Sequence, residues 1–169
     1  VTVGNVAPTV DAGPDQTVDE GDTVVFAGSI IDPGSADTHT ILWDFGDGST
    51  DSGSLTPTHV YTDDDLYTVT LSVTDDDGES HSDTMMVTVL NVAPTAVTDG
   101  PYNGDEGSPI TISGAGSFDP GLDIVLYEWD LDYDGITFDA DVIGMTTDVS
   151  MPDDGTFTVA LRVTDDDDA

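Results

Sequence analysis

Closely spaced aspartates are the residues of this chain best suited to chemistry. The segment Asp130-Leu-Asp-Tyr-Asp-Gly135 places Asp130, Asp132 and Asp134 at alternate positions, and Asp141 is the twelfth residue from its start. In EF-hand loops this spacing directs alternate carboxylates onto one calcium ion. No helical pattern flanks the segment, and Asp rather than Glu stands at the twelfth position. A weak calcium loop and a hairpin turn with solvated aspartates therefore both remain open.

The three histidines, His39, His59 and His81, form no recognisable catalytic or zinc-binding pattern. None has a counterpart in the second half of the chain, and none is spaced for a zinc-binding helix. No serine-nucleophile motif accompanies them. We expect a chain that is not an enzyme, in which His59 packs or forms hydrogen bonds beside Tyr61.

The charge of the chain restricts its partners. Its 169 residues carry a net charge of −35, with a single basic side chain, Arg162. Binding to a phosphate backbone needs clustered Lys and Arg, so nucleic acid is excluded as a direct partner. There is no cysteine and no apolar run long enough to span a bilayer, so neither disulfides nor membrane insertion is expected. Bound divalent cations, high salt or wide spacing over a wet surface would each offset the repulsion, and the runs of aspartate favour calcium.

The chain contains two copies of one repeat. Asn-Val-Ala-Pro-Thr begins at Asn5 and again at Asn91, an offset of 86 residues that also separates Trp43 from Trp129. The offset grows to 90 between Val73 and Val163. This spacing predicts two homologous domains, each of the size of a small β-sandwich.

Alternating apolar residues predict strands throughout. The runs 67–74 and 157–164 alternate without a break, and shorter alternating runs lie at 23–28, 40–45 and 85–90. Period two with β-branched and aromatic residues is typical of strands with one buried face. Because no segment has a helical period, we expect an all-β fold of two tandem immunoglobulin-like antiparallel β-sandwiches.

The two ends of the sequence suggest how the repeats divide. The segment Val1-Thr-Val-Gly-Asn-Val6 matches Val87-Thr-Val-Leu-Asn-Val92, so residues 1–4 are interpreted as the end of a preceding repeat's last strand. Domain 1 is then 5–90 and domain 2 is 91–169, and the second lacks a counterpart of the last strand of the first. We expect the resulting open sheet edge to be filled by a neighbouring chain or to be frayed.

The two tryptophans are expected in the cores. Trp43 shares strand parity with Ile41 and Phe45, which favours an inward position for it and for its counterpart Trp129. An outward tryptophan that stacks on a sugar ring is the alternative.

Three motifs of the first repeat resemble the PKD (polycystic kidney disease) domain family. They are Trp43-Asp-Phe-Gly-Asp-Gly-Ser49, His59-Val-Tyr61 and the strand that ends in Val73-Thr-Asp-Asp76. The second repeat departs from the pattern at Asp130–Gly135 and has no His-x-Tyr segment, but it keeps the opening motif and the Val-Thr-Asp-Asp ending. The resemblance implies seven-stranded immunoglobulin-like modules, extracellular or at the cell surface, in surface proteins and secreted hydrolases.

The resemblance also implies calcium ligands. Bacterial members that bind calcium use an Asn at the domain start, an Asp in the loop after the second strand and an Asp after the long alternating strand. Turn-forming residues without an ion are the alternative, and a neighbour in each aspartate run is an alternative ligand. By motif position the implied ligands are Asn5, Asp32, Asp76, Asn91, Asp119 and Asp166.

The combined prediction is a calcium-binding extracellular spacer or adhesive module of a multi-repeat protein. Its partners would be neighbouring repeats, other copies that bind at the open sheet edge, or a polysaccharide or protein polymer. Two alternatives keep the same fold: a substrate-binding accessory module of a secreted hydrolase, and a subunit of an extracellular filament assembled by strand sharing.

Overall fold

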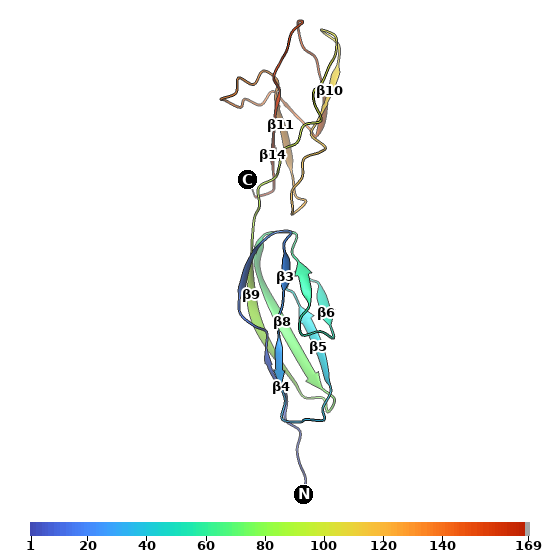
Figure 1. Ribbon diagram of the computed structural model, residues 1–169, viewed down its shortest axis with the longest axis vertical. Helices are drawn as coiled ribbons and strands as arrows, with labels where there is room; N and C mark the ends of the chain where they lie inside the picture. The colour runs from blue at the N-terminus through green and yellow to red at the C-terminus, as the bar shows by residue number, and fades with distance from the viewer. Residues whose placement is uncertain (168–169) are drawn as a thin grey trace. The chain divides into compact units, whose positions relative to one another are not determined.

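The computed structural model describes residues 1–167, and the chain separates into two compact units, Val1–Asn91 and Val92–Ala169. No helix occurs among the described residues. Each unit is a β-sandwich (Figure 1), so the predicted all-β, immunoglobulin-like fold is confirmed.

Unit 1 contains one large sheet and two short strand pairs. The large sheet has the order β2-β9-β8-β5-β6, in which β2 is parallel to β9 and the other pairs are antiparallel. The short pairs are β1-β4 and β3-β7. The strands are β1 (Thr9–Asp11), β2 (Gln16–Asp19), β3 (Thr23–Val25), β4 (Ser29–Ile31), β5 (His39–Asp44), β6 (Thr50–Ser52), β7 (Thr58–Val60), β8 (Asp65–Asp75) and β9 (Ser80–Leu90).

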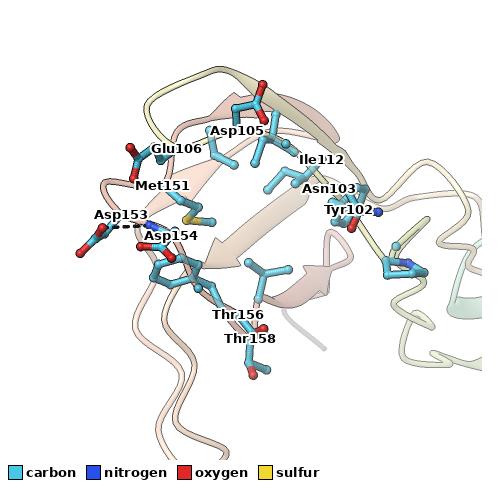
Figure 2. Close-up of a pocket in the computed structure, with 18 of the residues that line it drawn as sticks. Tyr102, Asn103, Asp105, Glu106, Ile112, Met151, Asp153, Asp154, Thr156 and Thr158 are labelled. Carbon is cyan, nitrogen blue, oxygen red and sulfur yellow. Dashed lines mark hydrogen bonds between the residues drawn. The ribbon is translucent and has the colours of Figure 1, made fainter.

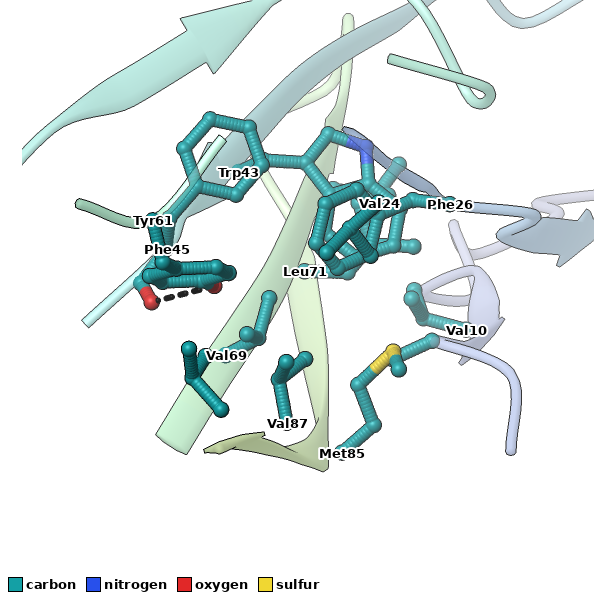
Figure 3. Close-up of a cluster of buried hydrophobic side chains, with 13 residues drawn as sticks. Val10, Val24, Phe26, Trp43, Phe45, Tyr61, Val69, Leu71, Met85 and Val87 are labelled. Atoms are coloured by element: carbon teal, nitrogen blue, oxygen red, sulfur yellow. Dashed lines mark hydrogen bonds between the residues drawn. The ribbon is translucent and has the colours of Figure 1, made fainter. Parts of the chain in front are cut away.

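The predicted alternation produces the core of unit 1. Along β8 every second side chain from Val69 to Asp75 is buried, as period two requires. Trp43 is fully buried, and the Phe26 ring lies 5.2 Å from both the Trp43 and the Phe45 rings (Figure 3). The core position predicted for Trp43 is therefore confirmed.

The Asp-Phe-Gly-Asp-Gly motif makes a tight turn after β5. Gly46 has φ +85°, and a Cβ atom at this position would lie 2.6 Å from the carbonyl oxygen of Thr68. Only glycine fits both the left-handed backbone and this close approach. The turn presents Asp47 to His59, whose Nε2 lies 2.6 Å from Asp47 Oδ2.

Unit 2 has a smaller set of strands. Its three-stranded sheet has the order β12-β11-β14, and β10 pairs with β13. Trp129 is fully buried beside Ile112 and Val149, which confirms the core position predicted for it. The strands are β10 (Ile110–Ser113), β11 (Leu126–Asp130), β12 (Val142–Ile143), β13 (Thr146–Val149) and β14 (Ala160–Thr164).

One strand prediction in unit 2 was too long. The alternating run 157–164 was expected to be a strand throughout, but β14 begins only at Ala160. In unit 1 the matching half of β8 pairs with β9. Among the described residues, unit 2 has no counterpart of β9, so residues 157–159 lack the partner strand that would extend the ladder.

Candidate metal site

Three aspartates of unit 1 meet where β4, β5 and β8 end or begin. Asp32 follows β4, Asp37 precedes β5, and Asp75 is the last residue of β8. The pairing of β5 with β8 places His39 opposite Asp75, which brings the loop before β5 to the end of β8. One carboxylate oxygen of each aspartate lies within 4.8 Å of the other two.

Asp75 is the buried member of this cluster, with 5% of its surface exposed. Its Oδ1 accepts hydrogen bonds from the backbone amides of Asp77, Gly78 and Glu79 at 3.1, 2.8 and 2.9 Å. Its Oδ2 accepts one from Asn5 Nδ2 at 2.8 Å. Burial acts to raise the pKa of Asp75, but the hydrogen bonds from Asn5 and from these amides outweigh it and lower the pKa. Asp75 is therefore a carboxylate at neutral pH.

Asp32 and Asp37 have opposite pKa shifts. Asp32 Oδ2 lies 2.8 Å from His39 Nε2, and its Oδ1 accepts a hydrogen bond from the Gly34 amide at 2.7 Å. These two hydrogen bonds lower the pKa of Asp32. Burial, followed by the negative charges of Asp32 and of the Asp75–Asp77 run, raises the pKa of Asp37. The charged form of Asp37 is therefore disfavoured beside the other carboxylates, and a cation bound among them would offset that repulsion.

The structure places the candidate Asp76 differently from its neighbour Asp75. Asp76 Oδ1 accepts a hydrogen bond from the Thr38 amide at 3.0 Å, and the side chain is exposed. Asp75 shares the inward parity of Val69, Leu71 and Val73. Strand parity, continued two residues beyond Val73, would have pointed to Asp75.

Unit 2 repeats part of this arrangement. Asp119 is 3% exposed, and its Oδ1 accepts a hydrogen bond from the Gly121 amide at 2.7 Å. Its Oδ2 has no hydrogen-bond partner among residues 1–167. Carboxylate oxygens of Asp119 and Asp123 lie within 4.8 Å of each other. Asp123 corresponds to Asp37 at the 86-residue offset.

Two predicted calcium ligands remain, Asp166 in unit 2 and Asn91 at the end of unit 1. Asp165, the counterpart of Asp75, is fully buried, whereas the candidate Asp166 is exposed. The candidate Asn91 directly follows β9 and is half-buried.

The aspartates of the Asp130–Gly135 segment accept hydrogen bonds from backbone amides of residues 132–139. Asp130 is buried, and its two oxygens accept hydrogen bonds from the amides of Asp132 at 3.1 Å and Asp139 at 2.9 Å. Asp134 Oδ1 accepts from the amides of Ile136 and Thr137, and these bonds lower the pKa of Asp134. The hydrogen bonds favour the hairpin-turn alternative, and a calcium loop formed by Asp130, Asp132 and Asp134 stays a prediction.

The histidines of unit 1 take part in packing and in contacts with aspartates. The His59 ring stacks on Phe45 with centroids 4.3 Å apart and meets the Tyr61 ring edge-on at 4.7 Å. The predicted packing of His59 beside Tyr61 is therefore confirmed. His39 contacts Asp32, as described above, and His81 is exposed.

Comparison with known proteins identifies similar modules in two bacterial proteases. The chain is 34% identical over 87 residues to a microbial collagenase of Vibrio alginolyticus, and this match covers 52% of the chain and 11% of the collagenase. It is 49% identical over 57 residues to the pre-pro-metalloprotease PrtV of Vibrio cholerae serotype O1, a match that covers 32% of the chain and 6% of that protein. The chain thus spans only a small fraction of the length of these relatives.

A comparison of structures gives a weaker likeness. A structure described as one of carbohydrate-binding modules from the β-sandwich superfamily has a TM-score of 0.45 and 18% identity, over 95% of this chain and 85% of the other.

No helix within residues 1–167 is long and apolar enough to cross a membrane.

Family models give the clearest result. The model of the PKD domain matches twice, over residues 5–89 and 91–169. Together these matches cover nearly the whole chain and coincide with the two copies of the repeat. The chain therefore belongs to the PKD domain family, of which it carries two tandem members.

Proposed function

We propose that this chain is a calcium-binding extracellular module that serves as a spacer or an adhesive segment of a longer protein. The observation that carries the proposal is the convergence of Asp32, Asp37 and Asp75, whose oxygens lie within 4.8 Å of one another. Three carboxylates held this close repel one another unless a cation or a proton lies between them. A cation would also tie the loop between β4 and β5, which carries Asp32 and Asp37, to the end of β8, which is distant in the sequence.

The chemistry of the ligands fits calcium. Calcium takes six to eight oxygen ligands from carboxylates, amide or backbone carbonyls and water. Asn5 already contacts Asp75 through its amide nitrogen, and its carbonyl oxygen is a suitable ligand type. Asp75 Oδ1 is already occupied by three amide hydrogen bonds, but Asp75 Oδ2 and the two oxygens of Asp32 have one hydrogen-bond partner each and keep a lone pair for a cation. We propose that Asp75 is the ligand that motif position assigned to Asp76.

Unit 2 supports the same proposal independently. A buried carboxylate oxygen without a partner is costly, and Asp119 Oδ2 is such an oxygen within the described residues. Asp123 lies beside it, so a cation would satisfy the orphaned oxygen and offset the charge of both groups. We propose Asp119, Asp123 and Asp165 as the ligands from unit 2.

Calcium titration of matched variants tests the proposal. Calcium is titrated into the chelator-treated chain by isothermal calorimetry, and Asp75→Asn is compared with Asp76→Asn. We expect Asp75→Asn to weaken one class of sites at least about tenfold, because removal of one charged ligand from a calcium site typically costs more than 1.4 kcal/mol. Asp76→Asn should leave that class unchanged. Equal affinities of both variants and the unaltered chain would contradict the assignment, and circular dichroism checks that both variants fold.

A substrate-binding accessory module of a secreted hydrolase is the second candidate. It is supported by the similarity to parts of a collagenase and a metalloprotease. Both tryptophans are fully buried, so a tryptophan platform for sugar rings is not available, whereas Phe118 and Phe157 are exposed. Co-sedimentation with insoluble collagen or cellulose separates the candidates, because a spacer stays in the supernatant with or without calcium.

A further inference from the structure

The two proposed calcium sites begin with the same turn. Asp32 and Asp119 each open an Asp-Pro-Gly segment, and the Oδ1 atom of each accepts a hydrogen bond of 2.7 Å from the glycine amide two positions on. The Oδ2 atoms differ. Asp32 Oδ2 lies 2.8 Å from His39 Nε2, whereas Asp119 Oδ2 is buried and has no hydrogen-bond partner within residues 1–167. The same turn therefore presents a satisfied carboxylate in unit 1 and an incompletely satisfied one in unit 2.

The residue at one strand position accounts for this difference. His39 begins β5, and its counterpart at the 86-residue offset is Val125, directly before β11. The pairing of β11 with β14 continues to this residue, because the Val125 amide donates a hydrogen bond to the Thr164 carbonyl at 2.9 Å. Valine has no side-chain donor, so unit 2 cannot satisfy Asp119 Oδ2 in the way that His39 satisfies Asp32 Oδ2.

An oxygen that already accepts a hydrogen bond gains less from a cation. Each proposed site offers three carboxylates, so the number of charges does not separate the sites. In unit 1, the His39 imidazole is the donor to Asp32 Oδ2, and the Asn5 amide is the donor to Asp75 Oδ2. A buried carboxylate oxygen without a donor instead carries the cost of its lost hydration. Because a bound cation relieves that cost, it stabilises the site of unit 2 more than the site of unit 1.

The loop that begins at Asp119 is shorter than its counterpart in unit 1. Three residues separate Asp119 from Asp123, one fewer than in the matching loop of unit 1. Within this loop Leu122 has φ +67°, a left-handed backbone that is unfavourable for leucine. A strained backbone persists only where the surrounding structure fixes it. The two carboxylates are therefore held near each other before a cation arrives, and such preorganisation favours binding.

Clustered acidic side chains alone do not make a site of this kind. Glu106, Asp153 and Asp154 also bring carboxylate oxygens within 4.8 Å of one another, at the rim of a pocket of about 960 Å³ in unit 2 (Figure 2). All three side chains are exposed, so water solvates their oxygens without an ion. They are a comparison, within the same unit, for the buried oxygen of Asp119.

We propose that unit 2 holds the tighter of the two calcium sites, and that the position occupied by His39 in unit 1 and by Val125 in unit 2 sets the difference. Calcium then fills unit 2 first, and unit 1 only at a higher concentration. The unit with the smaller core is thereby the first to be stabilised. This inference rests on the proposed function, because it concerns the order in which the same sites fill.

Site-resolved nuclear magnetic resonance tests this order on the full chain. Calcium is titrated into the chelator-treated, ¹⁵N-labelled chain. The amide signals of Gly121 and Gly34 report the two sites, because each amide donates to the Oδ1 atom of its own aspartate. We expect the Gly121 signal to reach its half-maximal shift at a calcium concentration at least about tenfold lower than the Gly34 signal does.

Exchange of the residue at the determining position gives the second arm of the test. His39→Val should lower the calcium concentration at the Gly34 midpoint by about threefold or more, and should leave the Gly121 midpoint unchanged. Val125→His, at a position that is 64% exposed, should raise the Gly121 midpoint by a similar factor. Unchanged dispersion of the other amide signals shows that each variant folds.

Two control variants and the order of saturation decide the outcome. His81→Val removes an exposed histidine of unit 1, Asp154→Asn removes one charge from the exposed acidic group of unit 2, and neither should move a midpoint. Simultaneous saturation, earlier saturation of Gly34, or a Gly34 midpoint unchanged in His39→Val would overturn the proposal while calcium binding itself stands. A shift of similar size in either control would also overturn it. Absence of saturable shifts at both glycines would overturn the proposed function as well.

Discussion

At the scale of single residues, Tyr61 is a buried anchor of unit 1. Its hydroxyl donates a hydrogen bond to the Phe45 carbonyl at 2.9 Å, and its ring stacks on Tyr67 with centroids 4.2 Å apart. Burial, followed by the negative charge of Asp47, raises the pKa of Tyr61. The neutral hydroxyl is therefore the form that holds the turn after β5 in place.

Removal of this hydroxyl should destabilise unit 1. We expect Tyr61→Phe to lower the free energy of unfolding by about 1–3 kcal/mol, because the buried Phe45 carbonyl loses its partner. Tyr67→Phe removes an exposed hydrogen bond to the Asp63 carbonyl and should change it by less than about 0.5 kcal/mol. Urea denaturation measures both variants, and equal losses would contradict the anchoring role.

Asp83 gives a prediction about pH. Its Oδ2 accepts a hydrogen bond from the Ala12 amide at 2.9 Å, and the amides of Ala12 and Thr84 lower the pKa of Asp83. A carboxylate whose pKa is lower in the folded state stabilises the fold above its unfolded pKa and loses this effect as the pH falls through the folded value. The Asp83→Asn variant should therefore melt several degrees lower than the unaltered chain at pH 7, and the difference should shrink below pH 3.8. A difference that persists or grows in acid would refute this account.

The positions of individual side chains were only partly predictable from the sequence. The core positions of Trp43 and Trp129 followed from strand parity, because a residue two positions from inward-facing apolar residues points to the same face of the sheet. Asp75 was covered only by the alternative that a neighbour in the run is the ligand, because motif position specifies a run of aspartates and tertiary contacts decide which member is buried. Asp37 was not identified.

At the scale of elements, β14 and β11 are linked by the single basic side chain. Arg162 and Glu128 are cross-strand partners, with Arg162 Nε and Nη2 at 2.8 and 2.7 Å from Glu128 Oε2. The guanidinium lies 4.5 Å from the centre of the Phe138 ring, which belongs to the loop between β11 and β12. Arg162 therefore holds a loop against the sheet as well as pairing two strands.

Replacement of Arg162 should loosen this loop. We expect Arg162→Gln to destabilise unit 2 by about 1 kcal/mol, the sum of a cross-strand pair and an exposed cation–π contact. Arg162→Lys should have a smaller effect, because it keeps the charge but loses the planar contact. Amide exchange of residues 131–141 should accelerate in the glutamine variant. Unchanged exchange there would exclude the proposed link to the loop.

The two long strands of unit 1 were predicted well, whereas the predicted strand 23–28 was too long, because β3 ends at Val25. The runs 67–74 and 85–90 lie within β8 and β9, which pair with each other. The run 157–159 has the same alternation but is not a strand, because period two reports side-chain parity and says nothing of whether a partner strand is present.

At the scale of the whole molecule, the two units differ in the size of their cores. The principal cluster of unit 1 contains 13 buried apolar residues, whereas that of unit 2 contains 3. Because burial of apolar surface is the main stabilising term, unit 2 should unfold first.

Calorimetry should therefore detect two transitions, with that of unit 2 at the lower temperature. Each variant with one tryptophan removed assigns one transition by fluorescence: Trp43→Phe leaves Trp129 as the reporter of unit 2, and Trp129→Phe leaves Trp43 for unit 1. The comparison uses the order of the two transitions, because each replacement also weakens its own core. Coincident transitions, or earlier unfolding of unit 1 in Trp129→Phe, would contradict the inference from core size.

The large net charge of the chain affects how the proposed calcium binding has to be tested. With a net charge of −35 and one basic side chain, any salt will stabilise the fold to some extent by screening. Specific calcium sites predict a further effect that screening cannot produce, because a ligand stabilises only the state that binds it.

The most direct measurement is a thermal melt in millimolar calcium, in chelator, and in chelator with sodium chloride at equal or higher ionic strength. The account predicts a large rise in melting temperature with calcium that sodium does not reproduce, and a smaller rise in the Asp75→Asn variant. An equal rise with sodium would contradict it and would mean that the aspartates are turn residues on a screened, salt-adapted surface.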